Sequence, residues 1–255
     1  MGLLKGIISL FSGGVSNNPS PDPKLVGNES AICPYCQSEL EKFPCRKKKC
    51  PTCKEFIFVR TRPSDNKKIL IREDQIIEVE ELWSIKNGTH DNFLEDRRKF
   101  SKQKESLTSA IGREPTENEV NLELLNQELA SYAKDYQWGL YRNAKLSIGT
   151  ILKKEGKLEE ALNLYLQVCY IDLNGPNNCC THDPELLAEF PPFDLDDAFL
   201  APGVVSYIDD IMHKMELNFK IVKARFVFES ENLRNNLGLK ADIEEAWEQI
   251  KSELI

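Results

Sequence analysis

Four cysteines in two closely spaced pairs carry the clearest chemical signal in the sequence. The pairs read CPYC and CPTC, and thirteen residues separate them. A Cys-Pro-x-Cys turn, here called a knuckle, places two sulfur atoms on one side of a tight backbone turn, and two knuckles can enclose one metal ion in a tetrahedron of sulfur. The pattern therefore predicts a Zn²⁺ site whose ligands are Cys33, Cys36, Cys50 and Cys53.

Other uses of these cysteines fit the spacing less well. A single C-x-x-C pair would suit redox chemistry, whereas two pairs at this separation are typical of a metal site. Iron is the main alternative, because the knuckles resemble those of rubredoxins, but the gap is short for that family and Gln37 and Lys54 stand where it usually has glycine. Cys45 lies between the knuckles at a spacing that no knuckle has, so we interpret it as a free thiol.

Positive charge is concentrated around the predicted metal site. Residues 31–72 contain eleven Lys or Arg and four Asp or Glu, a formal charge of +7, which leaves −15 on the rest of a chain whose net charge is −8. Phe43, Phe56 and Phe58 lie among the cations, and such interleaving can combine phosphate contacts with base stacking. An acidic protein surface, or the acidic remainder of this chain, would suit the same charge. The residues predicted to contact nucleic acid are Arg46, Lys47, Lys48, Lys49, Arg60 and Arg62.

A second group with metal-binding chemistry is the acidic run Asp194–Asp197. Asp194, Asp196 and Asp197 could together hold a divalent cation and support a metal-dependent enzyme. Asp at the start of a helix also commonly caps it, and we favour capping. The three histidines form no nucleophile–base arrangement and no HExxH helix by their spacing. The sequence therefore favours a non-catalytic protein, with the metal-dependent enzyme as the alternative.

The elements that must position the cysteines form a small β zinc ribbon over residues 31–72. Residues 55–60 are rich in β-branched and aromatic side chains and predict a strand, and residues 68–71 predict a second strand that can pair with it. So small a unit buries little apolar surface. Metal binding must therefore supply most of its folding free energy.

Residues 1–30 combine an amphipathic start with a linker. Apolar side chains from Leu3 to Phe11 recur at helical spacing. This spacing predicts either a weak membrane or partner anchor over residues 1–11 or a helix that docks on the same protein. Residues 12–30 are rich in Gly, Ser, Asn and Pro, which is the composition of a linker.

The rest of the chain is predicted to be helical. An apolar period of 3.6 predicts a connecting helix over residues 73–86, and a charged linker follows to residue 113. Residues 114–255 are predicted to form a helical domain, which begins where Thr116 and Glu119 have the spacing of a capping box. Its predicted helices run from Thr116 toward Trp138 and over residues 141–155, 158–173, 204–217, 219–233 and 241–254, with an irregular segment at 174–202.

Residues 142–175 resemble a tetratricopeptide repeat. Small side chains at Gly149 and Ala161 would let two antiparallel helices approach closely, Gly156 separates the helices, and Tyr165 fills the space beyond them. Val168 and Leu173 depart from the pattern of the family. The resemblance implies a protein-binding surface and, because one repeat cannot bury its own faces, a repeat-like helical bundle from residue 114 onward. An ordinary helical hairpin is the alternative.

The order of the parts also resembles bacterial and prophage proteins that join a CPYC…CPxC ribbon to a helical domain through a VRTRP-like segment. Here that segment is Val59-Arg60-Thr61-Arg62-Pro63. The resemblance supports a mainly α fold with a small N-terminal β zinc ribbon, and it implies no particular activity.

Cysteine usage and hydropathy indicate where such a protein works. Eight cysteines in 255 residues are too few for a disulfide-dense secreted scaffold, so we expect a reducing, cytoplasmic environment. No apolar run approaches the roughly 18 residues of a membrane-spanning helix. The sequence therefore favours a non-catalytic zinc-binding adaptor, whose basic ribbon contacts nucleic acid or an acidic protein and whose helical domain binds a protein partner.

Overall fold

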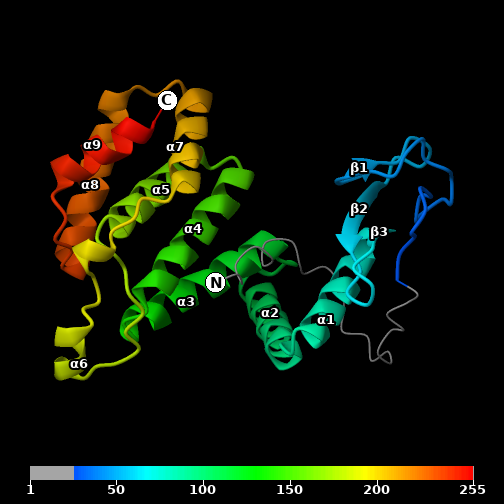
Figure 1. The fold of residues 1–255 in the computed structure, drawn as a ribbon, viewed down its shortest axis with the longest axis horizontal. Coiled ribbons are helices and arrows are strands. Elements are labelled where there is room, and N and C mark those ends of the chain that lie inside the picture. The colour runs from blue at the N-terminus through cyan, green and yellow to red at the C-terminus, as the bar shows by residue number, and fades with distance from the viewer. Residues whose placement is uncertain (1–25, 255) are drawn as a thin grey trace. The chain divides into compact units, whose positions relative to one another are not determined.

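The computed structural model describes residues 26–254, so the predicted amphipathic segment at residues 1–11 lies outside the described residues. The chain divides into two units, one that ends at Glu117 and one that begins at Asn118 (Figure 1). The described residues form a small sheet and nine α-helices, which confirms a mainly helical fold with an N-terminal sheet. None of the helices between residues 26 and 254 combines the length and hydrophobicity needed to cross a bilayer.

The sheet of the first unit has three antiparallel strands in the order β1-β2-β3. Both predicted strands are confirmed as β2 (Phe56–Thr61) and β3 (Lys68–Ile71), which pair with Phe58 opposite Ile71. The sequence did not predict β1 (Lys48–Lys49), which pairs with the start of β2. This strand brings the basic run between the knuckles against the aromatic start of β2.

The linker predicted to extend to residue 30 ends earlier, because residues 26–30 pack on the sheet. Asn28 and Leu70 exchange two backbone hydrogen bonds, of 2.9 and 2.8 Å. Val26 is only 2% exposed and joins the apolar cluster beneath β3. The ribbon therefore includes residues 26–30, which the sequence assigned to the linker, since backbone pairing with a distant strand leaves little trace in composition.

One face of the sheet is covered by helix α1 (Ile76–Lys86), which confirms the helix predicted over residues 73–86. Its first turn is the 3₁₀ helix η2 (Glu73–Gln75). Val79 and Leu82 pack against Phe58, Ile69 and Ile71. Two side chains fasten the helix to the β2–β3 turn: Trp83 Nε1 donates to the Thr61 carbonyl over 2.8 Å, and Lys86 Nζ donates to the Pro63 carbonyl over 2.5 Å.

The charged stretch that the sequence suggested as a linker is a helix, α2 (His90–Ile111). Within this helix only Phe100 is buried, and most of its charged side chains lie in solvent. Gly112 ends the helix in the left-handed conformation, with a φ of 72°. We therefore correct the charged linker to a long solvated helix that packs against α1.

The second unit is built from helices α3 to α9. The predicted hairpin at 141–173 is present as α4 and α5, and Gly156 separates them at a φ of 79°. A Cβ placed on Gly149 would lie 2.9 Å from Tyr165 Cε1, so the two helices meet at a distance that only glycine allows. The bounds are α3 (Glu117–Lys134), α4 (Trp138–Lys154), α5 (Leu158–Asp172), α6 (Pro184–Glu189), α7 (Pro202–Met215), α8 (Phe219–Leu237) and α9 (Ile243–Glu253).

Helix α5 lies at the centre of this unit, in contact with α4, α7, α8 and α9. Its apolar side chains are buried except for Leu158 and Leu164, which are partly buried, and Tyr170, Phe226 and Trp247 form an aromatic run across the core. The segment between α5 and α7 contains only α6 and the 3₁₀ helix η3 (Leu195–Asp197), in agreement with the irregular segment predicted at 174–202. It is held to the body by backbone hydrogen bonds, among them one of 3.2 Å from Phe199 N to the carbonyl of Asp172, the last residue of α5.

Candidate metal centre

Each pair of cysteines lies on a knuckle, and the two knuckles share one hydrogen-bonding pattern. In the first, Cys33 N donates to the Ser38 carbonyl over 2.9 Å and Gln37 N donates to the Cys33 carbonyl over 3.0 Å. In the second, Cys50 N donates to the Glu55 carbonyl over 2.8 Å and Lys54 N donates to the Cys50 carbonyl over 3.1 Å. Each knuckle therefore fixes the positions of its own two sulfur atoms. The second knuckle is itself the connection between β1 and β2.

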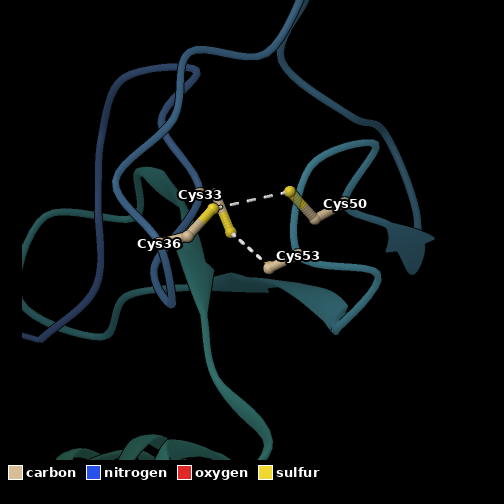
Figure 2. Close-up of side chains that lie close together, drawn as sticks. All are labelled: Cys33, Cys36, Cys50 and Cys53. Carbon is tan, nitrogen blue, oxygen red and sulfur yellow. Dashed lines mark hydrogen bonds between the residues drawn. The ribbon is translucent and has the colours of Figure 1, made fainter.

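The four predicted sulfur ligands converge on one point (Figure 2). All four Sγ atoms lie within 4.8 Å of one another, with 3.7 Å between Cys33 and Cys53 and 3.8 Å between Cys36 and Cys50. A tetrahedral zinc centre with Zn–S bonds of about 2.3 Å has sulfur–sulfur edges of about 3.8 Å. The geometry therefore confirms a four-cysteine cluster that can hold a metal, and its dimensions fit Zn²⁺.

The cluster sits between the sheet and the knuckle loops, in apolar surroundings. Cys33 and Cys50 have no exposed surface, and Leu40, Ile57 and Leu70 pack around them. A metal ion here would be shielded from water on its inner side. The packing ties the cluster to β2 and β3, so loss of the metal would disturb both strands.

Local hydrogen bonds divide the four thiols into two kinds. Burial opposes ionisation of Cys50, but the backbone amides of Cys53 and Thr52 and the hydroxyl of Ser38 outweigh it and lower the pKa to about 5. At Cys53 the amide of Glu55 favours the thiolate, yet burial and the neighbouring sulfurs prevail and raise the pKa to about 12. Four thiolates cannot coexist so closely without a cation, and a divalent metal that replaces the protons resolves this repulsion.

The donor set also distinguishes a structural site from a catalytic one. Four protein sulfurs complete a tetrahedron and leave no position for water or substrate. Cys45 is exposed and is not part of the cluster, as the sequence analysis expected. Between residues 26 and 254, the four cysteines are the one group of three or more candidate ligands that lie close enough together to hold a metal.

The acidic run at Asp194–Asp197 has a local structural use. Asp194 Oδ1 accepts a hydrogen bond of 3.0 Å from Asp196 N, so it caps η3. Asp197 Oδ2 lies 3.5 Å from Asn177 Nδ2. Asp194 therefore caps this short helix, as the capping interpretation expects.

The basic residues gather on the sheet next to the metal centre. Lys49 lies opposite Phe56 in the ladder, and Lys47, two residues before it, shares the face that carries Phe56 and Phe58. Lys47 Nζ lies 4.4 Å from the ring centres of both phenylalanines, and Lys49 Nζ lies 5.0 Å from that of Phe56. Phe56 is 41% exposed, whereas Phe58 is buried under α1. We call Lys47, Lys49 and Phe56 the basic-aromatic face.

The other four residues predicted to contact nucleic acid lie in three different environments. Arg46 and Lys48 line a hollow of about 510 Å³, formed by residues 42–48 beside this face. Arg60 lies on β2, with its guanidinium group over the ring of Phe58. Arg62 is only 4% exposed and pairs with Glu29 and Asp65, so it pins the β2–β3 turn and is not presented to a ligand.

Sequence reasoning missed two contributors to this region. Ser38 Oγ lies 3.1 Å from Cys36 Sγ and supports that ligand. Lys42 lines the hollow although it precedes the basic run by several residues.

The fold and the site define a class: a mainly helical protein with a four-cysteine metal centre in a small antiparallel sheet. Comparison of the chain with protein-family models, with curated proteins and with solved structures gives no match.

Proposed function

We propose that this protein is a non-catalytic adaptor in which a structural Zn²⁺ holds a nucleic-acid-binding ribbon, while the helical unit binds a protein partner. None of the eight cysteines, all of which lie among the described residues, forms a disulfide, and Cys45 and Cys180 are exposed, which suits a reducing compartment such as the cytoplasm. The observation that carries the proposal is the basic-aromatic face beside the four-sulfur cluster.

Zinc is the metal that suits this centre best. It prefers tetrahedral thiolate sites, has no redox chemistry and makes such sites structural. Cys50 at the start of the second knuckle directly follows β1, and the knuckle leads into β2. Zinc would therefore keep the strands that carry Lys49 and Phe56 in register.

The basic-aromatic face matches the two chemical features of a single-stranded nucleic acid. Lys47 and Lys49 place ammonium groups over the exposed ring of Phe56. Their long side chains can turn to contact phosphates while a base takes their place on the ring. Such stacking contributes about 1–3 kcal/mol per base. A duplex hides its base faces, so this surface favours single strands over duplexes.

The hollow beside the face extends the phosphate-binding surface. Residues Lys42, Arg46, Lys47 and Lys48 bring four cations to its walls, and no acidic residue lines it. An acidic protein would satisfy these charges as well, but it would gain little from a ring that is flanked by ammonium groups. We therefore favour nucleic acid over an acidic protein as the ligand of the ribbon.

The helical unit supports the second half of the proposal. The α4–α5 hairpin has the close approach at Gly149 and the buried Ala161 and Tyr165 that carry the resemblance to a tetratricopeptide repeat. Repeats of this kind use stacked helical hairpins as protein-binding surfaces. We propose the same use here.

The test of the ribbon is fluorescence anisotropy with a labelled oligothymidylate of about 15 nucleotides, a length within the usual site size of such proteins. The variant Lys47→Gln/Lys49→Gln should bind more weakly, and the slope of log K against log salt should fall by about 1.4, because each single-strand phosphate contact contributes about 0.7. The control Lys99→Gln/Lys102→Gln removes the same charge from the exposed side of α2 and should bind like the unmodified protein.

A second pair of variants tests the stacking. Phe56→Ala should weaken binding by about fivefold or more, since at least about 1 kcal/mol of stacking is lost. Ile111→Ala is the matched control, because Ile111 is an apolar side chain with 43% exposure in the same unit. Equal binding by Phe56→Ala and the unmodified protein, or tighter binding of a duplex than of the single strand, would contradict the proposal.

A further inference from the structure

The stretch that runs from the N-cap of α6 almost to α7, residues 183–199, is acidic and contains no basic residue. Over residues 183–199 it carries six carboxylates and no Lys, Arg or His. None of the six forms an ion pair within the described part of the chain, whereas Asp210 and Glu244 elsewhere in the unit pair with Lys153 and Lys223 over 2.7 and 2.6 Å. The six are Asp183, Glu185, Glu189, Asp194, Asp196 and Asp197.

The same segment exposes four large apolar side chains. The exposed fractions are 46% for Leu186, 59% for Phe190, 49% for Leu195 and 70% for Phe199. Leu186 and Phe190 are four residues apart along α6 and its end, so they lie on one side of that turn. Exposed side chains of this size next to unpaired charges are a usual mark of an interaction surface.

These side chains are exposed on a segment that is firmly held. Phe193, in the middle of the segment, points inward and packs against Trp138 at a ring distance of 5.2 Å. The backbone is fixed by hydrogen bonds from Asn177 N to the Pro192 carbonyl over 2.9 Å and from Phe199 N to the Asp172 carbonyl over 3.2 Å. A Cβ on Gly175 would lie 1.7 Å from the Asp194 carbonyl oxygen, so the segment approaches the body closely.

We infer that residues 183–199 form the surface on which the helical unit binds a basic amphipathic helix of a partner protein. This inference names the protein partner of the proposed adaptor and rests on that half of the proposed function. An amphipathic helix offers apolar side chains at intervals of three or four residues for Leu186 and Phe190, and its Lys and Arg side chains would pair with the carboxylates. A nucleic acid, or a second copy of this surface, would be repelled by six like charges.

The test uses the full chain and a labelled helical peptide of about 18 residues composed of Leu and Lys, which is about five turns long. Fluorescence anisotropy should show binding that weakens as salt rises, and a peptide with Glu in place of Lys should not bind. Phe190→Ser and Phe199→Ser should each weaken binding about tenfold, as expected for an apolar anchor. Phe228→Ser should leave binding within about twofold, because Phe228 is 62% exposed but lies on α8, outside the segment.

A second set of variants tests the pairing between the carboxylates of the segment and the lysines of the peptide. Glu185→Gln/Glu189→Gln should reduce the salt dependence, whereas Glu231→Gln/Glu248→Gln, which removes the same charge from α8 and α9, should not. Equal binding of the Leu-Lys peptide by Phe190→Ser, Phe228→Ser and the unmodified protein would overturn the inference, as would no binding at low salt. Self-association that Phe190→Ser abolishes would overturn it in favour of a second copy. Oligothymidylate binding by the same variants should be unchanged, which separates a failure here from a failure of the ribbon.

Discussion

Gln37 and Lys54 occupy the same left-handed backbone position, one in each knuckle, with φ angles of 60° and 65°. Each follows the second cysteine of its knuckle, and the amide of each closes the turn onto the carbonyl of the first cysteine. Side chains with a Cβ adopt this conformation at a cost of roughly 1–2 kcal/mol. The two knuckles are therefore near repeats that share one strained position.

Substitutions of Lys54 test whether the left-handed backbone conformation at this position affects zinc affinity. Lys54→Gly should keep or slightly increase zinc affinity, because glycine tolerates the left-handed position. Lys54→Ile should weaken zinc binding about tenfold, since a β-branched residue is strongly disfavoured there. Competition with a chromophoric chelator measures both affinities, and Lys42→Ile in the loop between the knuckles should bind zinc normally. Equal affinities of Lys54→Gly and Lys54→Ile would show that the knuckle is not under this constraint.

Loss of one sulfur ligand should affect the two units differently. Cys50→Ser should release the metal and expose the amides of β2 and β3 to hydrogen exchange, because metal binding supplies on the order of 10 kcal/mol to such sites. The helical unit should keep its protection, since its core around α5 contains no ribbon residue. Cys45→Ser should retain the metal and the protection of both units. Loss of protection in α5 after Cys50→Ser would contradict this separation.

The carboxyl group of Glu80 should make the first unit less stable as pH rises. Burial on α1, partly offset by the charge of Arg60, raises its pKa from 4.5 to about 7, and its Oε2 accepts no hydrogen bond from the described residues. Between pH 4.5 and about 7 the folded state therefore keeps a proton that the unfolded state releases. The contribution of Glu80 to the free energy of unfolding is thus highest below pH 4.5 and falls as the pH rises to about 7.

Glu80→Gln should remove this pH dependence. After allowance for solvent screening, the variant should be more stable than the unmodified protein by about 1–2 kcal/mol near pH 8 and about equally stable near pH 5. Chemical unfolding at both pH values measures the difference, in which contributions from the cysteines cancel. A constant difference between the two proteins across this range would refute the assignment.

The close approach of α4 and α5 should tolerate no side chain at Gly149. Gly149→Ala places a methyl group 2.9 Å from Tyr165 Cε1, and we expect a loss of about 1–3 kcal/mol in the free energy of unfolding. Gly203→Ala is the control, because a Cβ there has no neighbour within 4 Å and the position lies in the first turn of α7. It should be neutral or stabilising by up to about 1 kcal/mol. Thermal unfolding distinguishes the two, and an equally stable Gly149→Ala would contradict the packing.

Features with a local cause were predictable from the sequence. The knuckles are short-range turns whose cysteine spacing reports a metal directly, and Gly156 marks the turn of the α4–α5 hairpin by its backbone freedom. The strand β2 and the helix α1 were visible because a continuous apolar pattern marks each of them.

Features that depend on distant partners were not predictable. Arg62 looked like a ligand contact, yet Glu29 and Val26, 33 and 36 residues away, hold it in the turn. Helix α2 was missed because its residues are strongly polar, and only Phe100 among them is buried. Strand β1 has two residues, too few for any periodicity, and exists because β2 pairs with it.

The central claim is that the four cysteines hold one zinc ion. Native mass spectrometry of the purified full chain, with X-ray absorption at the metal edge, tests it directly. We expect one zinc per chain with four sulfur neighbours at about 2.3 Å. A chain that carries no metal after expression with zinc present, or one that carries iron in its place, would contradict the claim.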